Sequence, residues 1–267
     1  MTDGGALIEI DKVSRSFDGG SSFAVREVSL AVPAGAFVAV VGTSGSGKTT
    51  TLKMVNRLVE PDSGEVRVDG RPVAQSPAPV LRRSIGYVFQ GVGLFPHFSV
   101  AENIGITPRL LGWPTDQIAG RTRELLDLMG LPASYAARTP DALSGGERQR
   151  VGVARALAAR PRIVLMDEPF GALDPVTRDG LASAYRALHD RLGLTTLMVT
   201  HDVQEAVLLA DRIVVMKAGR VLANDTPQAL LKGSSDPEVA ALMDMPRRQA
   251  ARVRALMQGP DRTPADG

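Results

Sequence analysis

Hydrophobic and polar residues alternate near the start of the chain, and compact apolar runs follow further on. The alternation over Leu7 to Ile10 and over Ala24 to Val32 predicts β-strands. Alternation also follows the turn at Pro61 to Gly64 and predicts a strand over Glu65 to Val68. The compact, mostly apolar runs predict further strands at Phe37 to Val41, Ile85 to Phe89, Ile163 to Met166, Thr195 to Val199 and Arg212 to Met216.

Helical periodicity fills much of the sequence between these runs. A helix is predicted from Lys48 to about Leu58, and a mainly helical stretch from about Val92 to Arg160. Within that stretch, apolar residues at helical spacing mark Glu124 to Met129 and Glu147 to Ala159. Strands that alternate with helices indicate an α/β fold, in which helices cover both faces of a mainly parallel sheet and ligands bind at the carboxyl ends of its strands.

The domain organisation follows from the same pattern. The helical stretch, about 92–160, is expected as a lobe inserted into a single domain over residues 1–235, and Arg220 to Ala223 is expected to form a hairpin with the strand before it. Residues 236–267 are expected to add a C-terminal helical extension. Disorder is expected over Gly259 to Gly267, because this stretch is almost all Gly, Pro, Asp, Arg and Thr.

Composition narrows the classes of protein that remain. The chain has 267 residues, 44% of them hydrophobic, so it can bury a sizeable core. It has no cysteine, which excludes disulfides, thiolate metal sites and cysteine nucleophiles. Met1 to Ile10 shows no signal-peptide pattern, and no apolar run approaches the roughly 20 residues of a membrane span. Any work at a membrane is therefore expected to depend on partners.

Charge gives little support to nucleic-acid binding, because the formal net charge is +2 and most basic residues are interspersed with acids. We therefore expect no nucleic-acid partner. The exception to the mixed pattern is a group of arginines near the C-terminus, Arg247, Arg248, Arg252 and Arg254. The pattern favours a solvated helix face for this group, and contact with acidic lipid headgroups is the alternative.

The most informative motif follows the run Phe37 to Val41 directly. It fits the pattern G-x-x-x-x-G-K-[ST] and consists of Gly42, Thr43, Ser44, Gly45, Ser46, Gly47, Lys48, Thr49 and Thr50. Glycines let the backbone wrap an anion, so that N–H groups and the helix N-terminus face a triphosphate. Lys48 is expected to reach the β- and γ-phosphates of ATP, and Thr49 to hold Mg²⁺. An ordinary Gly/Ser turn is the alternative, and the full pattern in this setting favours nucleotide binding.

Two adjacent carboxylates end the run Ile163 to Met166. Neighbouring strand residues point in opposite directions, so Asp167 and Glu168 cannot share one task. Asp167 is expected to bind Mg²⁺, directly or through water, and Glu168 to act as the general base on an attacking water. Such a pair also occurs in proteins without catalysis, and the phosphate loop is what favours the catalytic interpretation.

Two more polar residues follow predicted strands at the same edge of the sheet. His201 comes shortly after Thr195 to Val199 and is expected to donate a hydrogen bond to the γ-phosphate; a structural histidine is the alternative. Gln90 comes after Ile85 to Phe89, where its amide can touch Mg²⁺, orient water or simply face solvent. Both residues join the candidate catalytic set.

The third motif stands immediately before a predicted helix and reads Leu143-Ser144-Gly145-Gly146-Glu147-Arg148-Gln149-Arg150. With it, the chain resembles the ATP-binding subunits of ABC transporters from about Leu7 to Leu231. The resemblance implies a P-loop ATPase fold with an N-terminal antiparallel β subdomain and an inserted helical subdomain. It also implies a homodimer, in which Ser144 to Glu147 contact in trans the ATP held by the other subunit. A second anion site at a helix N-terminus agrees with this, and a generic Ser-Gly-Gly helix start is the alternative.

The resemblance assigns roles to other positions as well. Phe17 matches the position that stacks on adenine, although Phe17 could instead be core, and Phe23 lies close enough to compete. Gln90 matches the loop that senses the permease, and Gly171 to Asp174 match the dimer seam.

The chain departs from the family pattern at two positions. Glu147 stands where the commonest form of the motif has glutamine, and Ala36 replaces the usual acid after Gly35. Little consequence is expected from either change, because neither position carries the phosphate-binding groups.

Partners and location also follow from the resemblance. It implies a homodimer bound to integral membrane permease subunits at the cytoplasmic face of the membrane, and an indirect partnership with a solute-binding protein. The segment Gly91 to Trp113, with its aromatic residues Phe95, Phe98 and Trp113, is the expected docking site for a permease helix. Core of the helical lobe is the alternative for these aromatic residues.

The substrate class rests on three further segments, which look most like those of osmoprotectant importers: Met54 to Gly64, Val92 to Ile104 and Pro108 to Trp113. Such importers take up glycine betaine, choline, carnitine and similar quaternary amines. Several carry CBS domains after the ATPase, and the residues after Leu231 are too few for that module. An ATPase of a polar amino-acid importer is the nearest alternative. A soluble ABC-type ATPase acting on ribosomes or DNA, and a scaffold that binds ATP without catalysis, are more distant ones.

Overall fold

The computed structural model describes residues 5–258, and a six-stranded sheet lies at its centre. The strand order across this sheet is β10-β9-β3-β8-β7-β6. All neighbouring strands are parallel except the hairpin pair β9 and β10. The strands span Phe37–Val41 (β3), Ile85–Val88 (β6), Ile163–Asp167 (β7), Thr195–Val199 (β8), Arg212–Lys217 (β9) and Arg220–Asp225 (β10). The predicted α/β fold with a mainly parallel sheet is confirmed.

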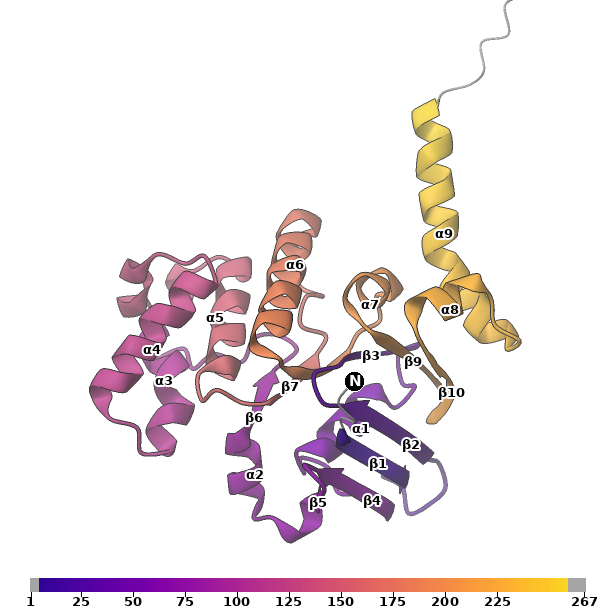
Figure 1. Ribbon diagram of the computed structural model, residues 1–267, viewed down its shortest axis with the longest axis horizontal. Coiled ribbons are helices and arrows are strands. Elements are labelled where there is room, and N and C mark those ends of the chain that lie inside the picture. The colour runs from indigo at the N-terminus through magenta and orange to yellow at the C-terminus, as the bar shows by residue number, and fades with distance from the viewer. Residues whose placement is uncertain (1–4, 259–267) are drawn as a thin grey trace, which may run out of the picture.

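A second sheet, wholly antiparallel, contains the N-terminal strands (Figure 1). Its order is β2-β1-β4-β5, with strands at Ala6–Arg15 (β1), Val25–Pro33 (β2), Ser63–Val68 (β4) and Arg71–Pro72 (β5). The first strand is longer than its alternating pattern predicts, because the pairing with β2 continues past irregularities between Ile10 and Arg15. Lys12 adopts a positive φ of 46° there, and such a break in the pleat interrupts the alternation.

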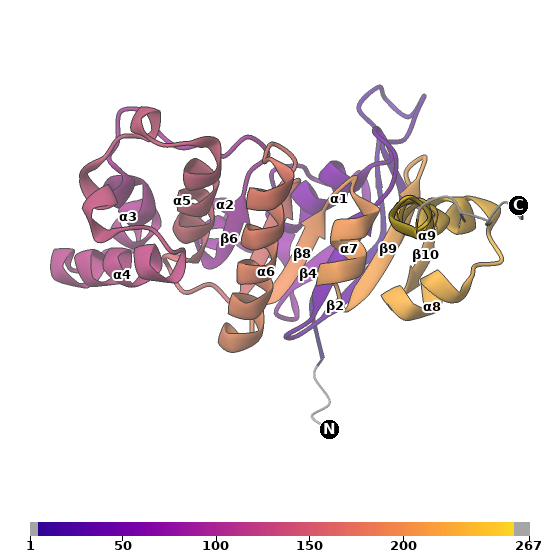
Figure 2. The same cartoon turned by 90° about the horizontal axis from the view of Figure 1, so that it is seen from above.

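Nine α-helices accompany these sheets within the described residues. They span Lys48–Val55 (α1), Ala78–Ser84 (α2), Val100–Leu110 (α3), Thr115–Leu128 (α4), Gly145–Leu157 (α5), Pro175–Leu192 (α6), Val203–Leu209 (α7), Pro227–Lys232 (α8) and Pro237–Gln258 (α9). Short 3₁₀ turns lie at Val73–Gln75, Ala133–Ala137 and Pro140–Ala142. Helices α3, α4 and α5 gather at one end of the molecule, and α8 and α9 lie at the other (Figure 2). Among residues 5–258, no helix combines the length and hydropathy that a bilayer crossing requires.

The first predicted helix and one predicted strand end earlier than expected. The first helix ends at Val55 rather than near Leu58, because Arg57 takes a left-handed φ of 56° and the Asn56 side chain accepts a hydrogen bond from the Leu58 amide at 3.2 Å. The strand predicted to reach Phe89 ends one residue earlier, at Val88.

The C-terminal arginines lie on α9, which projects away from the body of the protein (Figure 1). All four are exposed, and Arg248 pairs with Asp244 one turn earlier at 2.9 Å. This is the arrangement expected for a solvated helix face. The disorder predicted over Gly259 to Gly267 lies outside the described residues.

The central strand β3 is buried on both faces because it is apolar at every position. Along β3, the side chains of Phe37, Ala39 and Val41 belong to one hydrophobic cluster. The intervening Val38 and Val40 belong to another, which they share with the antiparallel sheet and α1. Successive strand residues point to opposite faces, so a continuous apolar run of this kind anchors the strand between two layers.

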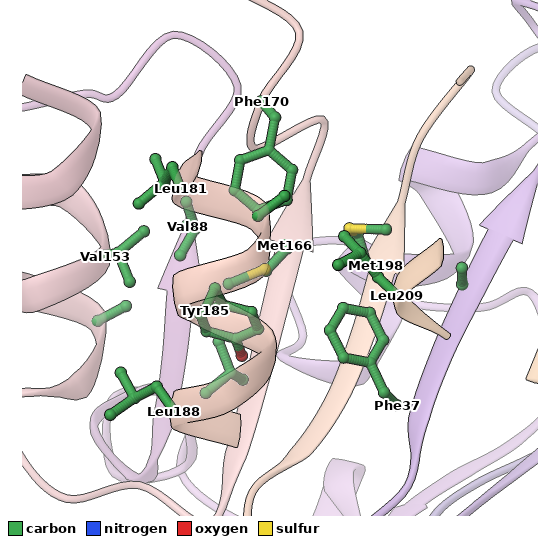
Figure 3. Close-up of a cluster of buried hydrophobic side chains, with 14 of the residues drawn as sticks. Phe37, Val88, Val153, Met166, Phe170, Leu181, Tyr185, Leu188, Met198 and Leu209 are labelled. Atoms are coloured by element: carbon green, nitrogen blue, oxygen red, sulfur yellow. The ribbon is translucent and has the colours of Figure 1, made fainter. Parts of the chain in front are cut away.

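Helix α6 covers the first face through residues at helical spacing, Leu181, Tyr185 and Leu188 (Figure 3). The Tyr185 ring meets Phe37 edge-on, with centroids 5.9 Å apart and an interplanar angle of 81°. Phe170, which follows β7, is fully buried in the same cluster. Burial of each such side chain contributes about 1.5–3 kcal/mol. This packing fixes the positions of β3 and β7, whose ends carry the two nucleotide motifs.

A chain of hydrogen bonds connects α6 with β8 and with Gly35, which lies two residues before β3. A carbonyl can only accept, so His189 Nε2 donates to the Gly35 oxygen at 3.2 Å. The neutral imidazole then accepts at Nδ1 from the Thr196 hydroxyl, at 3.0 Å, and Thr196 in turn accepts from Tyr185 at 2.8 Å. The sequence offered no role for this histidine, and the structure makes it a buried support of the sheet.

This buried histidine predicts a pH dependence of stability. Burial, assisted by the charge of Arg186, lowers the pKa of His189 below the ordinary 6.5, so the unfolded chain binds a proton that the folded chain excludes. The free energy of unfolding should therefore fall as pH drops below about 6.5, by up to about 1.4 kcal/mol per pH unit from this group. Urea titrations between pH 7 and 5, at roughly half-unit steps, measure this slope.

The control is the same substitution at two histidines. His189→Gln should flatten the pH dependence, whereas His97→Gln, at an exposed position, should leave it as in the wild type. Equal slopes for the wild type and His189→Gln would show that His189 does not carry the effect.

Candidate functional site

The phosphate loop, residues 42–48, connects the carboxyl end of β3 to the first residue of α1. Gly47 is the N-cap of this helix, with φ 98°, and no side chain caps the first turn. A Cβ on Gly42 would lie 2.1 Å from the Met216 carbonyl oxygen, and one on Gly47 would lie 2.3 Å from that of Ala24. Only glycine fits these positions. The loop therefore offers uncapped N–H donors and little side-chain bulk, which suits an anion.

The Lys48 side chain is buried across the loop. Its Nζ donates to the carbonyl oxygens of Gly42 and Thr43, at 2.9 Å each. Burial lowers the pKa of Lys48, and the negative charges of Glu168 and Asp167 partly offset this. Phosphate oxygens are stronger acceptors than carbonyl oxygens, so the ammonium is placed to turn toward a bound phosphate.

Thr49 and Asp167 meet beside the loop, although they stand 118 positions apart in the chain. The Thr49 hydroxyl donates to Asp167 Oδ1 at 2.8 Å, and Asp167 is only 4% exposed at the end of β7. The Tyr87 hydroxyl, from β6, lies 3.5 Å from the other carboxylate oxygen. Burial and the Asp167 charge raise the pKa of Tyr87, which keeps its phenol protonated. Hydroxyl and carboxylate oxygens are the hard ligands that Mg²⁺ prefers.

Glu168 has a different set of partners from Asp167. Gln90 donates from Nε2 to Glu168 Oε2 at 3.0 Å, and His201 Nδ1 lies 3.3 Å from the same oxygen. The backbone of Glu168 is left-handed, with φ 46°, and its N–H donates to the Val199 carbonyl at 2.8 Å. A left-handed non-glycine residue costs roughly 1–2 kcal/mol and is typical of functional sites. The ends of β6, β7 and β8 thus bring Gln90, Glu168 and His201 together.

The aromatic residue proposed to stack on adenine lies in the loop between β1 and β2. Phe17 is 63% exposed, so the alternative that Phe17 belongs to the core is wrong. The Arg15 guanidinium lies 4.9 Å from its ring centroid. Phe23 is less exposed and lies under Arg26, 5.5 Å away. The loop returns to Ala24, whose carbonyl abuts Gly47, so both rings belong to a loop that contacts the phosphate loop. The choice of Phe17 over Phe23 stays a prediction.

The third motif forms the start of α5. Ser144 is its N-cap, and its hydroxyl accepts from the Glu147 amide at 3.3 Å while Glu147 Oε2 accepts from the Ser144 amide at 2.7 Å. The Tyr135 hydroxyl donates to the other Glu147 oxygen at 2.8 Å. These bonds, led by the Ser144 amide, lower the pKa of Glu147. The acid that departs from the family pattern thus closes a reciprocal cap on the helix.

The surface beside this helix start is hollow. A pocket of about 510 Å³ is lined by Ser144 to Glu147, by Ala172 to Asp174 and by Thr177 and Tyr135, among others, and by none of the phosphate-loop residues. Ser144 and Gly145 are exposed. A Cβ on Gly146 would lie 2.6 Å from Thr177 Cγ2, so this glycine permits the close approach of α5 to α6. The start of this motif is therefore exposed on the surface, and the pocket beside it is separate from the phosphate loop of the same chain.

Two residues of the site were missed by the sequence reasoning. Tyr87 could be found only from the strand order, because it is the pairing of β6 with β7 that brings its hydroxyl to Asp167. Tyr135 sits in a short 3₁₀ turn, where no periodicity marks it. The structure otherwise brings together the residues predicted for the phosphate, metal and base positions, and leaves Ser144 to Glu147 apart from them.

Comparison with known proteins finds one matching family model. The model described as ABC transporter matches residues 25–171, more than half of the chain. Its range includes the phosphate loop, the carboxylate pair and the third motif.

Curated relatives match over most of the chain. The choline transport ATP-binding protein of Bacillus subtilis is 47% identical over 230 residues, which cover 86% of this chain and 60% of that protein. The glycine betaine uptake system ATP-binding protein of Escherichia coli is 50% identical over 225 residues, which cover 84% of this chain and 72% of that protein. The chain thus spans only about three fifths of the length of the Bacillus protein.

A solved structure of an ATP-binding cassette also aligns with most of the chain. A dimeric ATP-binding cassette in a post-hydrolysis state, bound to ADP and Pi, aligns with a TM-score of 0.75 at 31% identity. The alignment covers 83% of this chain and 99% of that structure.

Proposed function

The chain belongs to the ABC transporter family and carries the family's ATP-binding region, and from this premise we propose that it hydrolyses ATP to power a membrane permease. The single observation that carries the proposal is the convergence of four strand ends. At the ends of β3, β6, β7 and β8 lie Lys48, Gln90, Asp167 with Glu168, and His201, gathered around one phosphate loop. The direct test is release of phosphate from ATP by the purified protein, with Lys48→Ala as the variant that abolishes it.

Phosphate binding, Mg²⁺ binding and proton transfer fall to different residues of the site. The loop amides and Lys48 bind the β- and γ-phosphates, and Thr49 with Asp167 would hold Mg²⁺, which neutralises the developing phosphate charge. Glu168 takes the proton of the attacking water. Gln90 and His201 hold one oxygen of its carboxylate, which leaves Oε1 outside those two contacts and available to the water.

The site is completed by a second copy of the chain. Ser144 and Gly145 are exposed, and the pocket beside them is lined by no residue of the chain's own phosphate loop. A twofold arrangement lets the α5 N-terminus of each subunit face the ATP bound by the other, where its N–H groups and positive dipole favour the γ-phosphate. The dimeric form of the aligned cassette structure supports this assembly.

The solute is proposed to be a quaternary amine osmoprotectant. This proposal is supported by relatives at 44–50% identity that are named for the transport of choline, glycine betaine and carnitine. A solute-binding protein would deliver the solute to the permease, because the ATPase does not itself contact it. Uptake of labelled glycine betaine by cells that express the full transporter tests this, and uptake of a polar amino acid instead would favour the alternative importer.

A groove of about 350 Å³ between the sheet edge and the helical lobe is the proposed docking site for the permease. Its lining includes exposed apolar side chains, Leu58, Phe89, Phe95 and Leu110. Arg155 also lines the groove and donates to the Gly93 and Val92 carbonyls, at 2.6 and 2.9 Å. Such a groove suits an amphipathic helix.

Of the three aromatic residues predicted for docking, the structure places only Phe95 in this groove. Phe98 is half-buried and packs on Phe95, with centroids 5.3 Å apart. Trp113 is half-buried near Arg160, whose guanidinium lies 5.9 Å from its ring. None of them lies in the buried core.

Leu110→Glu should therefore weaken permease binding without altering ATP hydrolysis by the isolated subunit. Leu110 is 57% exposed on α3, and an acid at an apolar interface loses affinity, by about tenfold or more. Leu208→Glu is the matched control, because Leu208 is 66% exposed on α7 and lies outside the groove. The measurement is copurification of each variant with the permease; equal retention of both variants would place docking elsewhere.

A further inference from the structure

Arg178, in the first turns of α6, contacts two loops of the site at once. Its Nη2 donates to the Leu173 carbonyl at 3.1 Å, in the loop Gly171 to Asp174. Its Nη1 donates to Asp202 Oδ2 at 3.3 Å, in the turn that carries His201. A guanidinium is a rigid planar fork of donors, so it can hold two such segments at a fixed separation.

A second link reaches the same turn from its other side. Arg178 Nε lies 3.9 Å from Glu205 Oε1, and this buried nitrogen has no hydrogen-bond partner among the described residues. Glu205 Oε2 accepts from the Thr200 hydroxyl at 2.7 Å. Glu205 is 7% exposed, and burial raises its pKa. Arg178 thus binds Asp202, the residue after His201, directly. It also faces Glu205, the partner of Thr200, from about 1 Å beyond the usual hydrogen-bond distance.

The loop at the other end of Arg178 packs against the reacting groups. A Cβ on Gly171 would lie 3.7 Å from His201 Cε1 and 3.9 Å from Glu168 Oε2. The same loop ends at Asp174, whose side chain caps α6 by accepting from the Thr177 amide at 3.1 Å. Ala172 to Asp174 also line the pocket beside Ser144, on the surface proposed to meet the second subunit. Movement of this loop therefore reaches Glu168 and His201 by direct packing and by way of Arg178.

We propose that Arg178 is a positioning residue that couples the loop Gly171 to Asp174 to His201. Contact of this loop with a second subunit shifts the Leu173 carbonyl, the guanidinium follows, and the open contact to Glu205 closes. The turn around His201 is then held from both sides, and His201 and Gln90 orient the Glu168 carboxylate for proton transfer. The inference rests on the proposed ATPase function, and it assigns the step at which the dimer controls hydrolysis.

The test separates assembly from turnover. Arg178→Met should leave ATP affinity unchanged and lower kcat by about 10- to 100-fold, the cost of a misplaced catalytic group. In a Glu168→Gln background, Arg178→Met should leave ATP-dependent dimer formation unchanged, because the Arg178 contacts lie within one subunit. A defect in folding would instead reduce ATP binding, dimerisation and kcat together.

Two further variants complete the design. Arg186→Met is the matched control: Arg186 stands on the same helix and binds Asp190, Asp211 and the Leu209 carbonyl, so its loss should leave kcat unchanged. Glu205→Gln preserves the shape of the side chain and should lower kcat as well, and the double variant with Arg178→Met should be no slower than Arg178→Met alone.

The possible outcomes are distinct. A wild-type protein that hydrolyses ATP, with kcat of Arg178→Met and Glu205→Gln within about twofold of it, would overturn the coupling role alone. Parallel loss of dimerisation and kcat in Arg178→Met would also overturn it. Absence of hydrolysis by the wild type would overturn the proposed function and this inference together.

Discussion

Glu168→Gln should abolish turnover while ATP binding persists, because the substitution removes a proton acceptor and little else. The amide has the size of the carboxylate and keeps an oxygen for the hydrogen bond from Gln90 and the contact with His201. It cannot take a proton from water, so kcat should fall by about a hundredfold or more. Phosphate release measures the loss, and retention of unhydrolysed ATP on the purified variant shows that binding survives.

The adjacent carboxylate gives the matched comparison. Asp167→Asn removes one charge at the preceding residue. The side-chain partners of Asp167 are Thr49 and Tyr87, whereas those of Glu168 are Gln90 and His201. Asp167→Asn should weaken the binding of ATP with Mg²⁺, whereas Glu168→Gln should not. Near-normal hydrolysis by Glu168→Gln would remove Glu168 from the role of base, and equal loss of ATP binding in both variants would mean that the two acids share one task.

Mixing two inactive variants should restore hydrolysis if each site is built from two subunits. In Ser144→Arg, a bulky cation occupies the exposed helix start; in Lys48→Ala, the phosphate loop loses its ammonium. A mixed dimer contains one site that combines the intact loop of the first variant with the intact motif of the second. Each mixed dimer should recover about half of wild-type activity, because one of its two sites is intact.

Matched controls are available for both substitutions. Lys53→Ala lies on the same helix α1 and outside the loop, and Ser235→Arg adds the same cation at an exposed position between α8 and α9. Both should retain activity. Full activity of Ser144→Arg alone, or a mixture no more active than its components, would contradict a site shared between subunits.

Most of the fold could be predicted because its signals are local. Continuous apolar runs such as Phe37 to Val41 have no polar face, and only a strand covered on both sides accommodates them. Boundaries were less predictable where a single backbone angle decides them. The left-handed Arg57 that ends α1 and the irregularity at Lys12 within β1 leave no mark in the pattern of apolar residues.

The candidate site also contains residues that could be predicted from the sequence and residues that could not. Strand-end positions predicted the neighbourhood of Lys48, Asp167, Glu168 and His201, because parallel strands bring their carboxyl ends to one edge. Arg178 was not predictable, since it lies near the start of an amphipathic helix, where an arginine normally faces solvent. Its contacts depend on how α6, the loop before it and the turn after β8 pack together.

The most direct test of the central claim is the mass of the Glu168→Gln protein in solution, measured by light scattering with and without ATP and Mg²⁺. The account predicts a monomer without nucleotide and a dimer with it, and a monomer under both conditions once Ser144→Arg is added to the same chain. A monomer at saturating ATP, or a dimer that Ser144→Arg does not disturb, would contradict the claim that a second subunit completes the ATP site.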